Sequence, residues 1–335
     1  MKRSYSETIL QRSGLTAALA AVMCGCALQP HIVTSFWRIG TPADSIHSGY
    51  TVIHAEGKTR HCYPITGWTA DPAIDTYHQL HHHGVAVESE LMAYRIYFDK
   101  KQTIDPYCKR TPQLELAQSY WYPNDSLLAA GYGDDILRVS GTVGVGSVKY
   151  WNGKKHVHIE PVAERSQRIV SQSRNKATIE VAVKDWQIEN KSINMATRYT
   201  MHAGHRDMRC DVLLSDSLAR LCTGIQTIPA KGANQRSKIL NLKLQNGVLL
   251  ASFGTDWPVN DSAKYAKETV GLGVFIPKKY AGGIVQDKQN LLCLLKGTDP
   301  HFYLTCVGAT KESHPVATTA EEWFIYLRRW AAKLK

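Results

Sequence analysis

The densest group of chemically capable side chains lies between residues 77 and 97. Four histidines occur at 78–83, glutamates follow at 88 and 90, and Tyr-Arg-Ile-Tyr follows at 94–97. A histidine with a carboxylate supports general acid–base chemistry, and an arginine can bind a carboxylate through two parallel hydrogen bonds. Two histidines with a carboxylate can instead hold a metal ion. The spacing alone leaves these three chemistries open.

A second polar group is the glycine-flanked acidic segment 131–135, Gly-Tyr-Gly-Asp-Asp. It would project carboxylates from a loop, although Gly and Asp also dominate turns that have no function. Its spacing is not that of an EF-hand calcium loop. Aromatic rings between the two groups could stack on the apolar C–H faces of a sugar or simply pack in a β core: Tyr107, Tyr120, Trp121 and Tyr122.

Two His-x-His pairs, 81 with 83 and 156 with 158, would each place two imidazoles on one face of a strand. Such short matches arise easily by chance, and the sequence contains no H-E-x-x-H. We therefore assign no metal ligands and expect no cofactor. A divalent metal at the histidine cluster is the alternative.

The elements that must position these side chains are mostly strands. From residue 90 to 99 an apolar face alternates with a face that carries Arg95 and Tyr97, which is the period of a half-buried strand. Asn246-Gly247 between two apolar runs predicts a hairpin with a type I′ turn. Further strands are expected at 156–162, 177–187, 193–202, 209–214, 239–244, 248–253, 271–276, 291–296 and 301–308.

Two segments have helical signals. Thr318 and Glu321 match a capping box ahead of apolar residues at helical spacing, and a short helix is expected at 125–131. The prediction is an all-β protein, a large antiparallel sandwich with a C-terminal helix. We expect a loop-rich segment at 27–77 and a single sandwich domain at 78–335.

The composition is that of an ordinary globular protein with a basic surface. The net charge is +11 and the pI about 9.2, which favours anionic partners. Lysines and arginines are scattered, without the basic block of a nucleic-acid tail, so we expect no nucleic acid. An acidic polysaccharide, an anionic membrane and a merely solvated surface all stay compatible with the charge. The eight cysteines are widely spaced, and buried thiols are the expected outcome. A monomer or small homo-oligomer is expected.

The N-terminus has the profile of a signal peptide over residues 1–26. A basic start precedes an apolar run at 15–23 that is too short to span a membrane. Cys26 after Gly25 is a candidate lipid attachment site. We expect export to the periplasm, or an outer-membrane lipoprotein attached to the membrane through Cys26.

Several segments resemble a Bacteroidetes family catalogued as domain of unknown function 4861. They are 88–99 (ESELMAYRIYFD), 103–107 (TIDPY), 131–137 (GYGDDIL) with 141–146, 221–225 and 271–274. The resemblance covers roughly 78–335. It implies a galactose-mutarotase-like β-supersandwich, exported and encoded among polysaccharide-degrading enzymes, with relatives that remove water from terminal uronic acids.

Elimination at a uronic acid needs a base for the C5 proton, an acid for the leaving oxygen and a cation for the carboxylate. The leading hypothesis is therefore a lyase or hydro-lyase (dehydratase) acting on uronate-containing oligosaccharides. The alternatives are a glycoside hydrolase or aldose epimerase, and a non-catalytic glycan-binding lipoprotein. Candidate catalytic residues are His82, His83, Tyr94 and Glu90, and candidate substrate-binding residues are Arg95, Glu88, Tyr97, Tyr132, Asp134, Asp135 and Trp121.

Overall fold

The computed structural model describes residues 32–40, 51–55, 58–119, 121–228, 237–259 and 265–334. The predicted signal peptide, with Cys24 and Cys26, lies outside these residues, as does Tyr120. Within them, no helix is long and apolar enough to cross a membrane.

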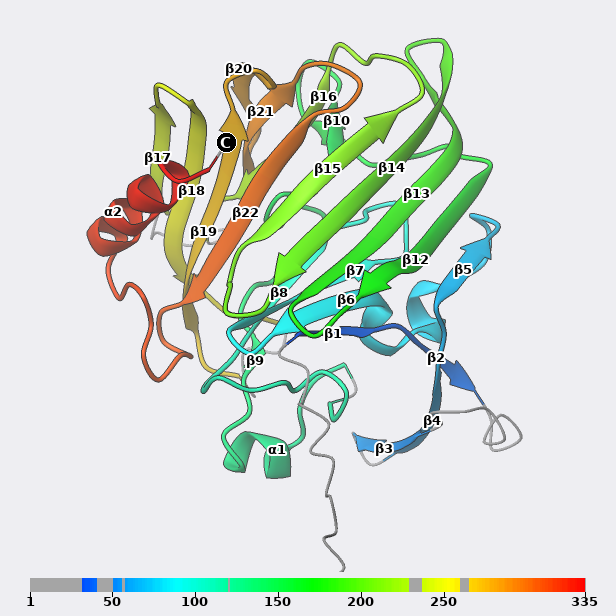
Figure 1. Cartoon of the computed structure of the whole chain (residues 1–335), viewed down its shortest axis with the longest axis vertical. Coiled ribbons are helices and arrows are strands. Elements are labelled where there is room, and N and C mark those ends of the chain that lie inside the picture. The colour runs from blue at the N-terminus through cyan, green and yellow to red at the C-terminus, as the bar shows by residue number, and fades with distance from the viewer. Residues whose placement is uncertain are drawn as a thin grey trace, which may run out of the picture.

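The described chain is mostly antiparallel β-sheet, as predicted, and the broadest layer is a nine-stranded sheet that spans Figure 1. Its strands, in spatial order, are β17 (Lys238–Lys243), β18 (Gly247–Asp256), β19 (Glu268–Pro277), β22 (His301–Gly308), β15 (Met208–Leu214), β14 (Lys191–His202), β13 (Lys176–Ile188), β12 (Glu164–Gln172) and β5 (Gly67–Ala70).

Two five-stranded sheets contact one face of this layer. The first contains β1 (Ile32–Ser35), β6 (Gly84–Ser89), β7 (Met92–Tyr97), β8 (Ile104–Cys108) and β9 (Asp134–Asp135). The second contains β11 (His156–Val157), β10 (Lys149–Trp151), β16 (Leu221–Gln226), β21 (Asn290–Leu295) and β20 (Ala281–Gln286). β6 contacts β12, β13 and β14, whereas β16 contacts β18 and β19. One apolar core fills the space between the layers.

The helix α2 (Ala320–Ala331) packs against β18 and β19, beside the C-terminus in Figure 1. Leu249, Ala251 and Phe253 contact its apolar face, whereas Val248 and Leu250 belong to the central core, so β18 is buried on both sides. The predicted C-terminal helix is confirmed.

Its capping box lies one residue later than predicted. Thr319 and Glu322 exchange the cap hydrogen bonds, and Thr318 donates its hydroxyl to Glu322 as well. Adjacent threonines and glutamates make two registers compatible with the motif, and the packing of Trp323 and Leu327 selects one of them.

The second helical signal is also confirmed, by α1 (Asp125–Ala129), which Asn124 caps. The predicted hairpin is present, because β17 and β18 pair with Lys243 opposite Val248. Its turn differs: Gly247 already belongs to β18 and does not have the positive φ of a type I′ turn.

The segment before residue 78 contains strands that join the domain's sheets. β1 pairs with β6 and β5 with β12, while β2 (Trp37–Gly40), β3 (Thr51–Ala55) and β4 (Lys58–Pro64) form a small separate sheet. Cys108, Cys210, Cys222, Cys293 and Cys306 are buried free thiols.

Candidate functional site

The polar face predicted for residues 90–99 lies on the outer side of β7. Met92, Tyr94 and Ile96 point into the central core, and Arg95 takes the opposite face of the strand. β8 pairs antiparallel with β7 so that Arg95 stands directly opposite Asp105. β9 follows on the far side of β8, with Asp135 opposite Tyr107. The sheet register therefore brings three charged side chains together from three strands.

Arg95 is the centre of this group and is 1% exposed. Its Nη2 lies 2.7 Å from Oδ2 of Asp105 and also contacts Asp135, while its Nη1 donates to the carbonyl of Trp121 at 2.8 Å. Tyr97 donates its hydroxyl to Asp105 at 2.5 Å. Burial opposes the charge of Arg95, but Asp105 and Tyr97 outweigh it and raise its pKa. The guanidinium is therefore a permanent buried cation.

A pocket of about 180 Å³ opens over this group. Burial, with the nearby Asp105 charge, raises the pKa of the Tyr97 and Tyr77 hydroxyls, so both stay protonated. The ammonium of Lys101 lies 5.1 Å from the Tyr77 ring centre and 5.4 Å from that of Tyr97. The polar side chains around the pocket are Tyr77, Tyr97, Lys101, Asp105, Tyr122, Asp135, Arg138 and Ser140.

His83 lies beside this pocket in an aromatic stack. Its ring is 3.9 Å from the centre of Tyr77 and 4.5 Å from that of Trp121, and it meets Tyr97 edge-on at 5.8 Å. Nδ1 lies 3.1 Å from the carbonyl oxygen of Tyr77. A carbonyl only accepts, so Nδ1 carries the hydrogen and Nε2 of the neutral ring keeps its lone pair. Burial lowers the pKa of His83 to about 3, so the ring is neutral near pH 7.

Residues 81–83, called the histidine turn below, include uncommon backbone dihedral angles. His82 and His83 have φ values of 58° and 61°, in the left-handed region that non-glycine residues rarely occupy. Gly84 follows, where an added Cβ would lie 2.0 Å from the carbonyl oxygen of Ile96. Pairing of β6 with β7 therefore holds the turn in place.

His81 and His82 point elsewhere. Nε2 of His81 contacts the carbonyl of Ser119, and Nε2 of His82 lies 2.8 Å from that of Leu116. His82 is completely buried, and burial lowers its pKa well below the usual value. His82 therefore does not line the pocket, and its Nε2 is engaged by the backbone.

Several other candidates make internal contacts away from the pocket. Glu88 is 1% exposed, pairs with Lys109 and accepts the backbone N–H of Leu116 at 3.0 Å. Tyr94 donates its hydroxyl to the carbonyl of Arg206 at 2.6 Å, within the core. Glu90 accepts the N–H of Gly204 at 3.1 Å.

In the acidic segment 131–135, only one of the three predicted site residues lines the pocket. Asp135 lines the pocket, whereas Asp134 accepts the backbone N–H of Asp135 at 2.7 Å. Tyr132 is half-buried, and burial together with Glu115 raises its pKa. Of the eleven predicted site residues, Tyr97 and Asp135 line the pocket, and Arg95 contacts Asp135 from beneath it. His83 packs against the pocket residue Tyr77, and Trp121 packs against His83.

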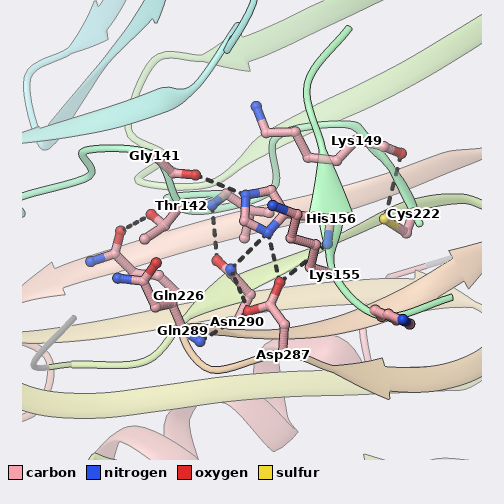
Figure 2. A network of polar contacts seen from close by, with 12 residues as sticks. Gly141, Thr142, Lys149, Lys155, His156, Cys222, Gln226, Asp287, Gln289 and Asn290 are labelled. Carbon is pink, nitrogen blue, oxygen red and sulfur yellow. Dashed lines mark hydrogen bonds and ion pairs between the residues drawn. The ribbon is translucent and has the colours of Figure 1, made fainter. Parts of the chain in front are cut away.

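His156 belongs to a separate network, shown in Figure 2. Its Nδ1 lies 2.7 Å from Asp287 and its Nε2 2.8 Å from the carbonyl of Gly141, while Asn290 donates to Asp287 at 2.8 Å. These contacts join β11, the loop after β20 and the Gly141 loop. Among the described residues, no three His, Cys, Asp or Glu side chains gather as metal ligands.

Asp105, Tyr77, Lys101 and Arg138 were not among the predicted site residues. Asp105 lies in the segment 103–107 that carries part of the family resemblance, but its role depends on which residue of β7 it faces. An acidic residue one strand after an arginine is the only sequence signal. The antiparallel pairing of β7 with β8 places Asp105 opposite Arg95, and this pairing is visible only in the structure.

Comparisons with known proteins place the chain in a family. No curated protein matches it. Among solved structures it is similar to the crystal structure of 4-alpha-glucanotransferase from Thermococcus litoralis, with 10% identity and a TM-score of 0.34. That alignment covers 72% of this chain but only 39% of the other, well under two thirds of its length. A family model described as a domain of unknown function, DUF4861, matches residues 51–335, beginning earlier than residue 78. The chain therefore belongs to the DUF4861 family.

Proposed function

We propose that this protein is carbohydrate-active and eliminates water or an alcohol from a uronic acid in an acidic oligosaccharide. The observation that supports this most is the pocket over Arg95, where hydroxyls, carboxylates and cations surround about 180 Å³. That volume is below the roughly 300–1,000 Å³ of pockets for drug-sized ligands. It suits one polar sugar ring at the end of a chain.

The reaction would begin with removal of the proton from C5 of the uronate. The electron pair of the C5–H bond forms a C4=C5 double bond, the C4–O bond breaks, and the oxygen leaves as water or as a sugar alcohol after it takes a proton. The carboxylate next to C5 stabilises the developing negative charge only when cations or hydrogen-bond donors meet it.

Lys101 and Arg138 would bind this carboxylate. Each is ion-paired with an aspartate, Lys101 with Asp99 at 3.1 Å and Arg138 with Asp256 at 3.0 Å, and each keeps more than a fifth of its side chain exposed. Because both cations are partly open to solvent, a substrate carboxylate can compete with the aspartates for them. Arg95 is already occupied by Asp105 and Asp135, so it would hold these carboxylates in place rather than bind substrate.

His83 would be the base. Its hydrogen bond to the Tyr77 carbonyl leaves Nε2 as the acceptor, and its ring packs against two tyrosines that line the pocket. Burial is the main cause of the low His83 pKa, and the positive charge of Arg95 lowers it further. A bound carboxylate offsets that positive charge and raises the basicity of the ring. Tyr77 or Tyr97, both protonated, would supply the proton to the leaving oxygen.

The test is ultraviolet absorbance of a conjugated C4=C5 double bond during incubation with uronic-acid oligosaccharides, with and without a chelator. A rise in absorbance in both conditions would support elimination by the side chains of the pocket. A rise that chelator abolishes would assign part of the chemistry to a metal. Release of reducing sugar without absorbance would favour a glycoside hydrolase, and retention on an oligosaccharide column without any product would favour a binding protein.

A further inference from the structure

A second pocket, called the larger hollow below, lies beside the pocket over Arg95, which is called the smaller hollow. The volume of the larger hollow is about 430 Å³. One side is the exposed segment 71–75 with Ala73 and Ile74 at the rim, and the other side is formed by Asp99, Glu160 and Arg165. Neither the predicted site nor the proposed reaction uses this hollow.

The two hollows are neighbours. Tyr77 lines both, and the turn after β7 stands between them: Lys101 borders the smaller hollow while Asp99 and Lys100 border the larger. A chain of sugar rings held in the smaller hollow would therefore continue past the Tyr77 side chain into the larger one.

One guanidinium nitrogen of Arg165 has no hydrogen-bond acceptor among the described residues. The residue is 6% exposed, its Nη2 donates to the carbonyl of Ile159, and its Nη1 is buried without a hydrogen-bond partner. Leaving a buried donor unsatisfied is unfavourable, and more so when the donor is charged. Arg165 lines the larger hollow, so an oxygen of a ligand bound there is a suitable acceptor for its guanidinium.

The charges of the larger hollow favour a neutral ligand. Four carboxylates line it, at 71, 75, 99 and 160, against two cations, Lys100 and Arg165. Hydroxyl groups can donate to these carboxylates, whereas an anionic ligand would be repelled by them. The ring of Tyr77 and the apolar side chains at 70, 72–74 and 161–162 offer surface for the C–H faces of a sugar.

We infer that the larger hollow is a second subsite, which binds a neutral sugar unit adjacent to the uronic acid held over Arg95. This inference rests on the proposed function and narrows it, because it names the substrate as an oligosaccharide with an acidic end unit and a neutral neighbour.

The test uses Ala73→Trp, which fills the rim of the larger hollow from an exposed position, with Ala73→Ser as the matched control. The probes are two pairs: methyl glucuronide with glucuronosyl-β-1,4-glucose, and the corresponding galacturonate compounds. Elimination is followed by absorbance, and binding of each probe is measured separately by titration calorimetry. Circular dichroism confirms that both variants fold.

The expected result is that Ala73→Trp raises KM for the disaccharide about tenfold, a binding loss of about 1.4 kcal/mol. Kinetics with the methyl uronide should not change, and Ala73→Ser should behave as wild type. An unchanged KM for the disaccharide in Ala73→Trp would overturn the subsite and leave the proposed reaction intact.

Calorimetry separates the two proposals when no elimination occurs. Disaccharide binding that Ala73→Trp weakens and Ala73→Ser does not would support the subsite, although the reaction would have failed. Equal binding by both variants, or no disaccharide binding by the wild-type protein at millimolar concentration, would overturn the subsite.

Discussion

Arg95 and Asp105 occupy directly opposite positions on β7 and β8, and their side chains meet with an Nη2–Oδ2 distance of 2.7 Å. Both residues are at most 2% exposed, and Asp135 contacts the same guanidinium nitrogen. One arginine thus compensates two buried carboxylates, and this compensation allows both to lie at the base of a pocket.

Replacing Arg95 with Met should reduce the free energy of unfolding by about 3–5 kcal/mol, because Asp105 and Asp135 would remain buried without their cation. Urea unfolding measures this. Lys184→Met is the control, since Lys184 pairs with Glu164 on the surface and its loss should cost about 1 kcal/mol or less. Equal stability of the two variants would contradict the assigned role of Arg95.

Replacing His83 with Gln should lower kcat for elimination by about 100-fold or more while the fold is kept, because an amide cannot act as a base. The glutamine N–H can still reach the Tyr77 carbonyl that His83 bonds. His78→Gln is the matched control, because His78 is an exposed neighbour paired with Asp75. If both variants keep full activity, another group is the base.

Stability should fall as the pH decreases from about 6.5 to about 3. Burial lowers the pKa of His83 and of His158 to about 3, whereas an unfolded histidine titrates near 6.5. Within this window the unfolded chain binds protons that the folded protein does not, so protonation favours unfolding. Urea midpoints measured from pH 7.5 to 4.5 should decrease, and His158→Asn should reduce the slope. Identical slopes would show that His158 is not responsible.

Lys149 should produce a second pH dependence at alkaline pH. It is fully buried, its Nζ donates to the carbonyl of Lys101, and burial lowers its pKa to about 7. Between about pH 7 and 10.5 the unfolded chain holds the extra proton, so stability should rise with pH. Lys149→Met should be more stable than wild type at pH 7, with a difference that narrows toward pH 10. A constant difference across this range would contradict the low pKa.

Gly84→Ala should destabilise the protein by more than about 2 kcal/mol and disturb the histidine turn. The added Cβ would lie 2.0 Å from the Ile96 carbonyl oxygen, which pairing of β6 with β7 prevents from moving. Gly283→Ala is the control, because its nearest contact would be an ordinary 3.9 Å to Leu294. Thermal unfolding of both variants, with kcat for Gly84→Ala, distinguishes local strain from a general intolerance of alanine in strands.

Much of the strand pattern could be predicted from sequence because alternation is a local property. The period-2 pattern at 90–99 placed Tyr94 and Arg95 on opposite faces of one strand, and the structure confirms this division. The prediction did not distinguish which polar residues would lie at the pocket. Glu88 and Arg95 both belong to the polar group at 77–97, and both are 1% exposed. Glu88 is enclosed by Lys109 and the backbone of residues 115 and 116, whereas Arg95 pairs with the two aspartates that line the pocket.

The β-rich architecture, the apolar face of β7 and the helix α2 could be predicted from the sequence, because periodicity and caps act within a few residues. The candidate site could not, because it is assembled by contacts between distant segments. Asp105 meets Arg95 through strand register, Asp135 joins them from a segment some forty residues along the chain from Arg95, and His83 reaches Tyr77 and Trp121 through a left-handed turn. These contacts depend on how β6 to β9 pair, and pairing between strands minimises free energy over the whole sheet and not over any one segment.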